Sequence, residues 1–293
     1  MPPFIFGIVA VAAVVHAAWN VILKTSGDPL KTSGRAMVAG VAVGLPFAIV
    51  AYVAVGSPQI PPQAIALAVV SGVVEAVYFV LLSAAYRRGD LSVVYPIARG
   101  TAPLFAVAAG IFILGEHLSV PGAVGVGAIA AGIIVIQRPW RALRGAGGRR
   151  SADRAVLFAL ATGVAIATYS AIDSVGVRFV APWLFAAMLF PVGAVALVAW
   201  VRYVDRAVVD GGAPWPRAAV AGTLSLMGYL LILFAYSVAP LTIVAPLRES
   251  AVVLGSSWGS FRLGEATDRA DGARRIAGAA LVVAGALLVG LAG

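Results

Sequence analysis

Charged side chains interrupt long apolar stretches of this chain at places where they could do chemistry. Glu75 lies within "SGVVEAVYFVLLS", Arg99 follows "VVYPIA", and Arg248 and Glu249 follow "IVAPL". An ionisable group in hydrocarbon is costly unless it faces a protein interior and finds a partner there. Each of these residues is therefore a candidate for ligand binding or proton transfer, weighed against a purely structural hydrogen bond or salt bridge.

Glu75 is the candidate best suited to proton transfer. On a helix, Ser71, Glu75 and Tyr78 share one face, so Glu75 and Tyr78 are expected to line the same cavity and to contact a ligand. Burial favours the neutral form of a carboxyl group, which suits a group that binds and releases protons. The alternative is a neutral carboxyl group that is hydrogen-bonded to a neighbouring helix.

Two prolines stand at equivalent distances from the remaining charges. Pro96 precedes Arg99 by three residues, and Pro246 precedes Glu249 by three. Each proline removes a backbone hydrogen bond, so both helices are expected to kink or break. Arg99 and Glu249 are assigned to ligand binding, with a static salt bridge between them as the alternative. Arg248 is about 100° from Glu249 around a helix, so we assign Arg248, like the prolines, to gating or structure.

A polar stripe also crosses the first apolar run, "VVHAAWNVILK". Trp19 and Asn20 are candidates for ligand contact, and His16, which titrates nearest to neutral pH, is a second candidate for proton coupling. The alternative is that these side chains bond neighbouring helices to one another. Later runs add Tyr229 as a lining residue, and Tyr169 and Asp173 as gating or structural residues.

Catalytic and metal sites find little support in this sequence. The chain has no cysteine and two histidines, which leaves no thiolate site and no multi-histidine cluster. It also lacks the GKS or GKT loop of ATP-driven proteins. We therefore expect no enzymatic activity, no metal and no cofactor.

The elements that must position these residues are helices that span a membrane. Apolar residues make up 61% of the 293 positions and charged residues 11%, whereas about a quarter of a soluble domain is charged. A spanning helix needs about 20 predominantly apolar residues, and ten runs qualify. We expect an all-α integral membrane protein with helices near 3–23, 34–55, 62–86, 91–114, 119–137, 154–176, 182–201, 216–237, 241–261 and 272–291.

The chain also contains an internal repeat. "AYRRGDLSVVYPIARG" at 85–100 aligns with "AYSVAPLTIVAPLRES" at 235–250, and an "LGE" at 114–116 corresponds to another at 263–265. Matches in the same order at nearly one offset indicate a duplication. We expect five-helix repeats at 1–137 and 154–293, joined by a basic cytoplasmic linker at 138–153. Because each repeat has an odd number of spans, the two should be inverted relative to each other.

The distribution of positive charge predicts the orientation. Of the 21 lysines and arginines, 18 lie in the loops that follow odd-numbered runs, and only Arg178 lies in a loop on the other side. Cytoplasmic loops are enriched in these residues, so both termini should lie outside the cytoplasm of an inner (plasma) membrane. Charges scattered over five loops, with no aromatic residues between them, do not indicate nucleic-acid binding.

Taken together, these features resemble the drug/metabolite transporter superfamily, and within it carriers with two EamA-type domains. Each half ends in "LGE" followed by a helix rich in glycine and alanine, and "HAAWNVILK" and "ATYSAIDSVGVR" are similar to the first helices of the two domains. The uncharged loop "GSPQIPPQ" departs from the family's usual pattern, and for orientation we follow the charge bias. The resemblance implies secondary transport of small organic solutes, often export.

These observations lead to one favoured function and three alternatives. Mixed charges suit a small polar metabolite such as an amino acid, carried by alternating access about a mid-membrane site between the repeats. The alternatives are a proton-coupled exporter of drugs or quaternary cations, a carrier of an anionic or phosphonate-type metabolite, and a non-transporting membrane scaffold. The expected partners are the solute and the lipid bilayer, and the sequence leaves a homodimer open.

Overall fold

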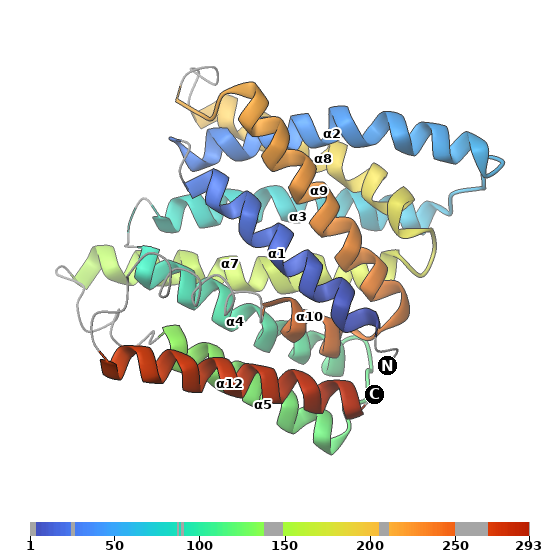
Figure 1. Cartoon of the computed structure of the whole chain (residues 1–293). Coiled ribbons are helices and arrows are strands. Elements are labelled where there is room, and N and C mark those ends of the chain that lie inside the picture. Colours follow the sequence, from blue (N-terminus) through green and yellow to red (C-terminus); the bar gives the residue numbers. More distant parts are fainter. Residues whose placement is uncertain are drawn as a thin grey trace.

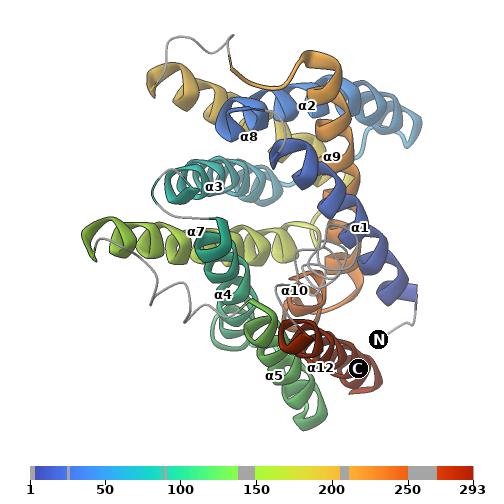
Figure 2. The ribbon, with the colours of Figure 1, turned by 60° about the vertical axis from the view of Figure 1, so that its left-hand side comes forward.

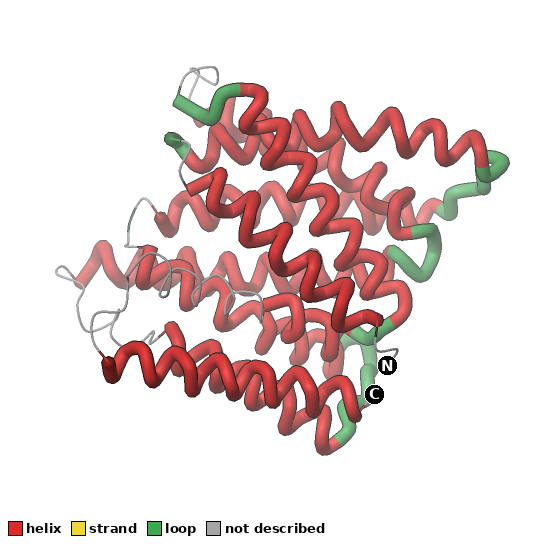
Figure 3. The backbone as a smooth tube through the Cα atoms, in the orientation of Figure 1, coloured by secondary structure: helices red, strands yellow, loops and turns green. Residues whose placement is uncertain are grey.

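The computed structural model describes residues 4–24, 27–86, 88, 91–137, 149–204, 211–249 and 269–292, and Figure 1 shows its arrangement. The regular structure in these residues is entirely helical (Figure 3). The helices are α1 (Phe4–Lys24), α2 (Pro29–Ala54), α3 (Pro62–Tyr86), α4 (Leu91–Phe112), α5 (Val120–Gln137), α7 (Arg149–Gly176), α8 (Pro182–Val204), α9 (Trp215–Val238), α10 (Leu241–Glu249) and α12 (Arg269–Ala292).

Each helix coincides with one of the apolar runs, which confirms the all-α prediction for the described residues. The largest differences are at the starts of α2 and α7, which begin five residues before the predicted runs. Helix α7 therefore includes the last residues of the predicted linker. Of the ninth predicted run, 241–261, the structure describes only the part up to Glu249, and the remainder lies outside the described residues.

Helix α2 begins early because Asp28 caps it. The Asp28 carboxylate accepts the backbone N–H groups of Leu30 at 2.9 Å and Lys31 at 3.0 Å, which have no acceptor within the helix. Lys31 and Arg35, which are two of the 18 residues counted above in the loops after odd-numbered runs, therefore lie in the first turns of α2 rather than in a loop. Arg35 donates to the carbonyls of Gly212 and Ala213, which ties this turn to the segment before α9.

The helices are apolar enough for a multi-pass membrane protein. Within the described residues, five helices have the length and composition to cross a bilayer, namely α2, α3, α7, α8 and α9. Shorter apolar stretches occur at Phe4–His16, Ile97–Phe112, Val120–Val135 and Ala280–Val289. Many large apolar side chains, such as Phe47 and Phe112, are exposed on these helices, as expected where the surrounding solvent is lipid.

The two halves of the chain interlock. Helix α3 packs against α7 and α8, while its counterpart α9 packs against α1 and α2. Two further pairs, α4 with α10 and α5 with α12, also join one half to the other, and Figure 2 shows α5 and α12 side by side. The α5–α12 contact is close because it is made by glycines: a Cβ atom added at Gly125 would lie 2.7 Å from the Gly285 carbonyl oxygen.

The two prolines do not break their helices. The backbone is helical through Pro96 in α4 and through Pro246 in α10, so the expectation of a break is wrong. Each proline is the sixth residue of its helix, so the carbonyl that it deprives of a donor belongs to the second residue, Ser92 or Thr242. One bond lost so close to a helix start leaves the following turns intact.

Candidate functional site

A cluster of polar side chains is buried between the two halves of the chain. It contains Glu75 and Tyr78 from α3, Arg99 from α4 and His16 from α1, all in the first half. The second half contributes Tyr169 and Asp173 from α7, Tyr229 from α9 and Arg248 from α10. Among them Glu75, Arg99 and Asp173 are at most 5% exposed, so the interlocked packing of the helices places unlike charges in the interior.

Asp173 is held by one hydroxyl group from each half. Ser71 on α3 donates to one carboxylate oxygen, and the Tyr229 hydroxyl on α9 donates to the other, each at 2.5 Å. Asp173 therefore uses both of its carboxylate oxygens as hydrogen-bond acceptors. Arg248 is the nearby cation that interacts with it electrostatically.

Glu75 has a different environment, one turn along α3 from Ser71. Its Oε2 atom is buried and has no hydrogen-bond partner among the described residues. The carboxyl group lies against α8, where a Cβ atom at Gly193 would be 3.6 Å from Oε2, and Asp173 is close enough to interact with it electrostatically. A buried carboxyl group beside a second one, with an unused oxygen, is suited to hold a proton or to accept an N–H from a ligand.

Arg99 forms the cationic end of the cluster. Its guanidinium lies 2.8 Å from His16 Nε2 and donates to the Tyr78 hydroxyl at 3.4 Å. His16 Nδ1 accepts the indole N–H of Trp19 at 3.2 Å. The planar guanidinium of Arg99 suits a carboxylate.

Arg248 approaches the same region from α10. It donates to the Ser170 hydroxyl at 3.2 Å, and its guanidinium carbon lies 5.7 Å from the centre of the Tyr169 ring. Both Arg248 and Arg99 act electrostatically on His16. The two arginines therefore reach the cluster from equivalent helices of the two halves.

Aromatic rings connect the anionic and cationic parts. Tyr78 packs against Tyr169 with ring centres 6.0 Å apart, and Tyr169 against Tyr229 at 6.3 Å. Phe190 on α8 packs edge-on against Tyr229 at 5.2 Å. The far side of Phe190 borders an apolar pocket of about 350 Å³ between α2, α8 and α9. The rings can hold an organic solute or its cationic group by stacking and cation–π contact.

The structure thus brings together Glu75, Tyr78, Arg99, His16, Trp19, Tyr169, Asp173, Tyr229 and Arg248 from the predicted set. The side chains of Asn20, Pro96 and Glu249 lie outside the described residues, so the pairing of Arg99 with Glu249 stays a prediction. Sequence reasoning missed Ser170 and Phe190. Ser170 shares a helix face with Asp173, three residues away, and that spacing could have identified it; nothing in the sequence marks Phe190.

Within the described part of the chain, no group of three histidine, cysteine, aspartate or glutamate side chains could hold a metal ion. The arrangement can instead bind a small organic molecule that carries charge, through carboxyl, guanidinium, phenol and aromatic groups.

The fold and the site together define a polytopic helical membrane protein with a polar cluster buried between its halves. The sequence profile of the EamA-like transporter family matches the chain twice, at residues 4–138 and 153–291. The chain therefore belongs to this family, as a member of the drug/metabolite transporter superfamily with two EamA domains. A solved structure described only as "Crystal structure of protein" has the same fold, with a TM-score of 0.75 at 20% identity over 99% of both chains. No curated protein matches the sequence.

Proposed function

We propose that this protein is a secondary active transporter that exports a small polar organic metabolite such as an amino acid. The observation that carries the proposal is the buried cluster itself, to which each half contributes one carboxyl group and one arginine: Glu75 and Arg99 from the first, Asp173 and Arg248 from the second. Charges are costly in a membrane and are usually retained for function. The outward direction of transport rests on the family resemblance.

We further propose that the helices form ten spans in two inverted five-helix repeats, 1–137 and 154–293, in the plasma membrane with both termini non-cytoplasmic. The direction of the helices supports this arrangement, because α1 and its counterpart α7 run in opposite directions (Figure 1). The exchange of α3 and α9 between the halves supports it as well. In such a fold the two repeats can rock about a site between them.

The mixed charges favour a zwitterion. A solute carboxylate can bind Arg99, because a guanidinium presents its N–H donors as a planar fork that matches a carboxylate. A solute ammonium group can bind the unused oxygen of Glu75. Opposite charges in the solute then neutralise both ends of the site, whereas a bare cation or anion would leave one end uncompensated.

A proton-coupled exporter of organic cations is the second candidate, and one observation favours it. Glu75 is close enough to Asp173 and Tyr229 to interact with both electrostatically, and the Tyr229 ring packs against Tyr169. Carboxyl groups with aromatic walls bind quaternary ammonium groups well. In this case a proton and the cation would compete for the same carboxyl pair.

Transport by purified protein in liposomes tests these proposals. Labelled amino acids, a cationic dye and an organic anion should be compared, each with and without a pH gradient. We expect movement of an amino acid, and an Arg99→Gln variant should lose affinity for amino acids but keep affinity for the matching amines, which lack the carboxylate. If the dye alone moves, the second candidate is correct, and if no solute of the three classes moves under either condition, the carrier proposal fails.

A further inference from the structure

The first "LGE" of the sequence ends in a side chain that does not belong to the polar cluster. Glu116 follows the end of α4, in the loop before α5. Its backbone N–H donates to the Gly110 carbonyl at 2.9 Å, and Gly115 before it adopts a φ of 66°, which folds the loop back over the helix end. This turn directs Glu116 toward the other half of the chain, where its side chain is only 8% exposed.

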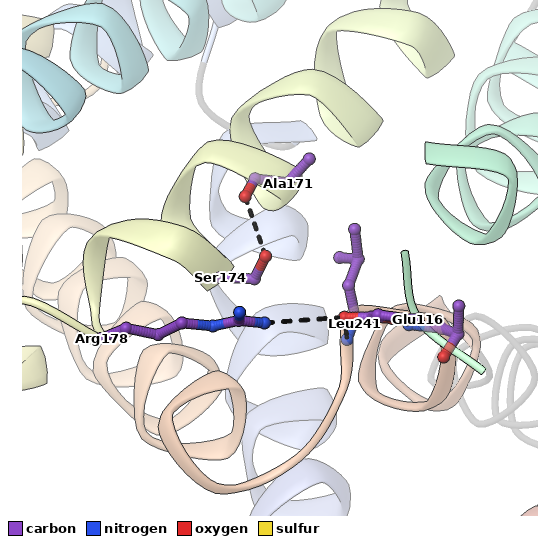
Figure 4. Close-up of polar contacts among 6 residues, drawn as sticks. Glu116, Ala171, Ser174, Arg178 and Leu241 are labelled. Atoms are coloured by element: carbon purple, nitrogen blue, oxygen red, sulfur yellow. Dashed lines mark hydrogen bonds and ion pairs between the residues drawn. The ribbon is translucent and has the colours of Figure 1, made fainter. Parts of the chain in front are cut away.

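The carboxylate of Glu116 caps the start of α10. One oxygen accepts the N–H of Leu241 at 2.9 Å and the other accepts the N–H of Thr242 at 2.8 Å. These are the first residues of α10, whose N–H groups have no acceptor within the helix, and the positive end of the helix dipole favours an anion there. Figure 4 shows that Arg178, in the turn after α7, reaches the same carboxylate, at 4.0 Å.

This contact determines how α10 lies on α4. The two helices are in close contact at the level of the cap, since a Cβ atom added at Gly110 would be 2.6 Å from Thr242 Cγ2. Arg248 follows Thr242 by six residues on α10 and contacts Tyr169 and Ser170 in the polar cluster. A displacement of the α10 start away from α4 would therefore move Arg248 relative to the second half's own helix α7.

We infer that Glu116 is a latch that closes the polar cluster toward one face of the membrane, the face of loops 113–119, 177–181 and 239–240. In the described state the latch holds α10 of the second half against α4 of the first. It must open when that face of the site opens during transport, so this inference rests on the proposed function. Glu116 is a positioning residue, because its contacts are with backbone N–H groups and Arg178 rather than with the cluster.

A cysteine at Thr242 reports directly on the latch. Thr242 is fully buried, and the chain contains no cysteine, so a Thr242→Cys protein has one thiol. In detergent, a Glu116→Gln change should raise the rate of maleimide labelling of this thiol roughly tenfold or more, because the neutral amide carries a single acceptor oxygen for the two N–H groups. Equal labelling rates with glutamate and glutamine at 116 would overturn the inference.

Two control variants separate the latch from general loosening. His117 is the exposed neighbour of Glu116, so His117→Gln should leave the labelling rate unchanged. Arg178 is 57% exposed and 4.0 Å away, so Arg178→Gln should raise the rate less than Glu116→Gln does. A similar increase in all three variants would show that the loop is merely destabilised, and would contradict a specific role of Glu116.

A disulfide tests whether the latch must open during transport. A protein with both Gly110→Cys and Thr242→Cys should form a disulfide on oxidation. Its transport should be lost while the disulfide is present and should return on reduction. Oxidation should leave the transport rate of each single-cysteine variant unchanged. If the cross-linked protein transports normally, the latch inference is wrong while the proposed function stands. If the unmodified protein transports nothing, the proposed function fails, and the labelling rates still decide whether Glu116 holds α10.

Discussion

Ser71 on α3 donates its hydroxyl hydrogen to Asp173 on α7, so the third helix of one half is bonded to the first helix of the other inside the membrane. Tyr229 completes the coordination of Asp173 from α9. One buried carboxylate thus links three helices from the two homologous halves.

The hydrogen bonds to Asp173 should contribute strongly to stability. Ser71→Ala or Tyr229→Phe leaves one oxygen of a buried carboxylate unbonded, which should cost about 1.5–3 kcal/mol. The measurement is the thermal midpoint of the purified protein in detergent. Thr168→Ala on α7 is the control, because Thr168 is exposed and donates to Val164 in its own helix. A loss for Thr168→Ala as large as that for Ser71→Ala would contradict the prediction.

Glu75 and Asp173 should respond in opposite ways when each is neutralised. Glu75→Gln keeps the size of a buried carboxyl group whose Oε2 has no hydrogen-bond partner in the described structure, so the thermal midpoint should stay the same or rise. Asp173→Asn places an NH₂ group opposite one of two hydroxyl donors, so the midpoint should fall. The test is the thermal midpoint of both variants. A marked fall in the midpoint of Glu75→Gln would show that Glu75 has a structural role.

Glu75→Gln should also remove the dependence of transport on a pH gradient, because the amide neither binds nor releases a proton at physiological pH. The test is solute uptake into proteoliposomes at fixed solute concentration, with internal and external pH varied independently. An unchanged pH dependence in the glutamine variant would show that Glu75 is not the proton site. In that case His16, the other residue predicted to couple protons, should be replaced by glutamine next.

Two glycines on α5 should differ sharply in their tolerance of alanine. A Cβ atom at Gly125 would lie 2.7 Å from the Gly285 carbonyl oxygen and 2.9 Å from the Val289 nitrogen, both backbone atoms of α12. Gly125→Ala should therefore separate α5 from α12 and destabilise the protein by about 1–3 kcal/mol. Gly127 has open space around its Cβ position, so Gly127→Ala should be neutral or slightly stabilising. Equal thermal midpoints for the two variants would disprove close α5–α12 packing at Gly125.

The predicted orientation can be tested with single cysteines. Gln59 lies in the exposed α2–α3 loop, and Arg88 lies exposed after α3, near the opposite ends of that helix. A Gln59→Cys protein should react with an impermeant thiol reagent in intact cells, whereas Arg88→Cys should react only after the membrane is permeabilised. The reverse pattern would place both termini in the cytoplasm.

The positions of the helices could be read from the sequence, because the requirement that sets them is local. A bilayer-spanning helix needs a long apolar run bounded by charges and turn residues, and the runs 62–86 and 182–201 are within a few residues of α3 and α8. The errors at the start of α2 also have a local cause, the Asp28 cap, which could have been recognised from an aspartate followed by Pro29. Likewise, the chain's duplication was visible in the two "LGE" segments.

Which polar side chains meet was decided by the tertiary structure. Glu75, Arg99 and Arg248 could be selected one by one because a charge within an apolar run is conspicuous. Their neighbours could not, because lipid is as apolar as the helix surface and the hydrophobic pattern does not show which face packs against which helix. The bonds of Asp173 to Ser71 and Tyr229 and of Glu116 to α10 join residues 56 to 126 positions apart. The Ser71–Asp173 bond exists because α3 packs against α7 of the other half, and Glu116 reaches α10 because α10 packs against α4.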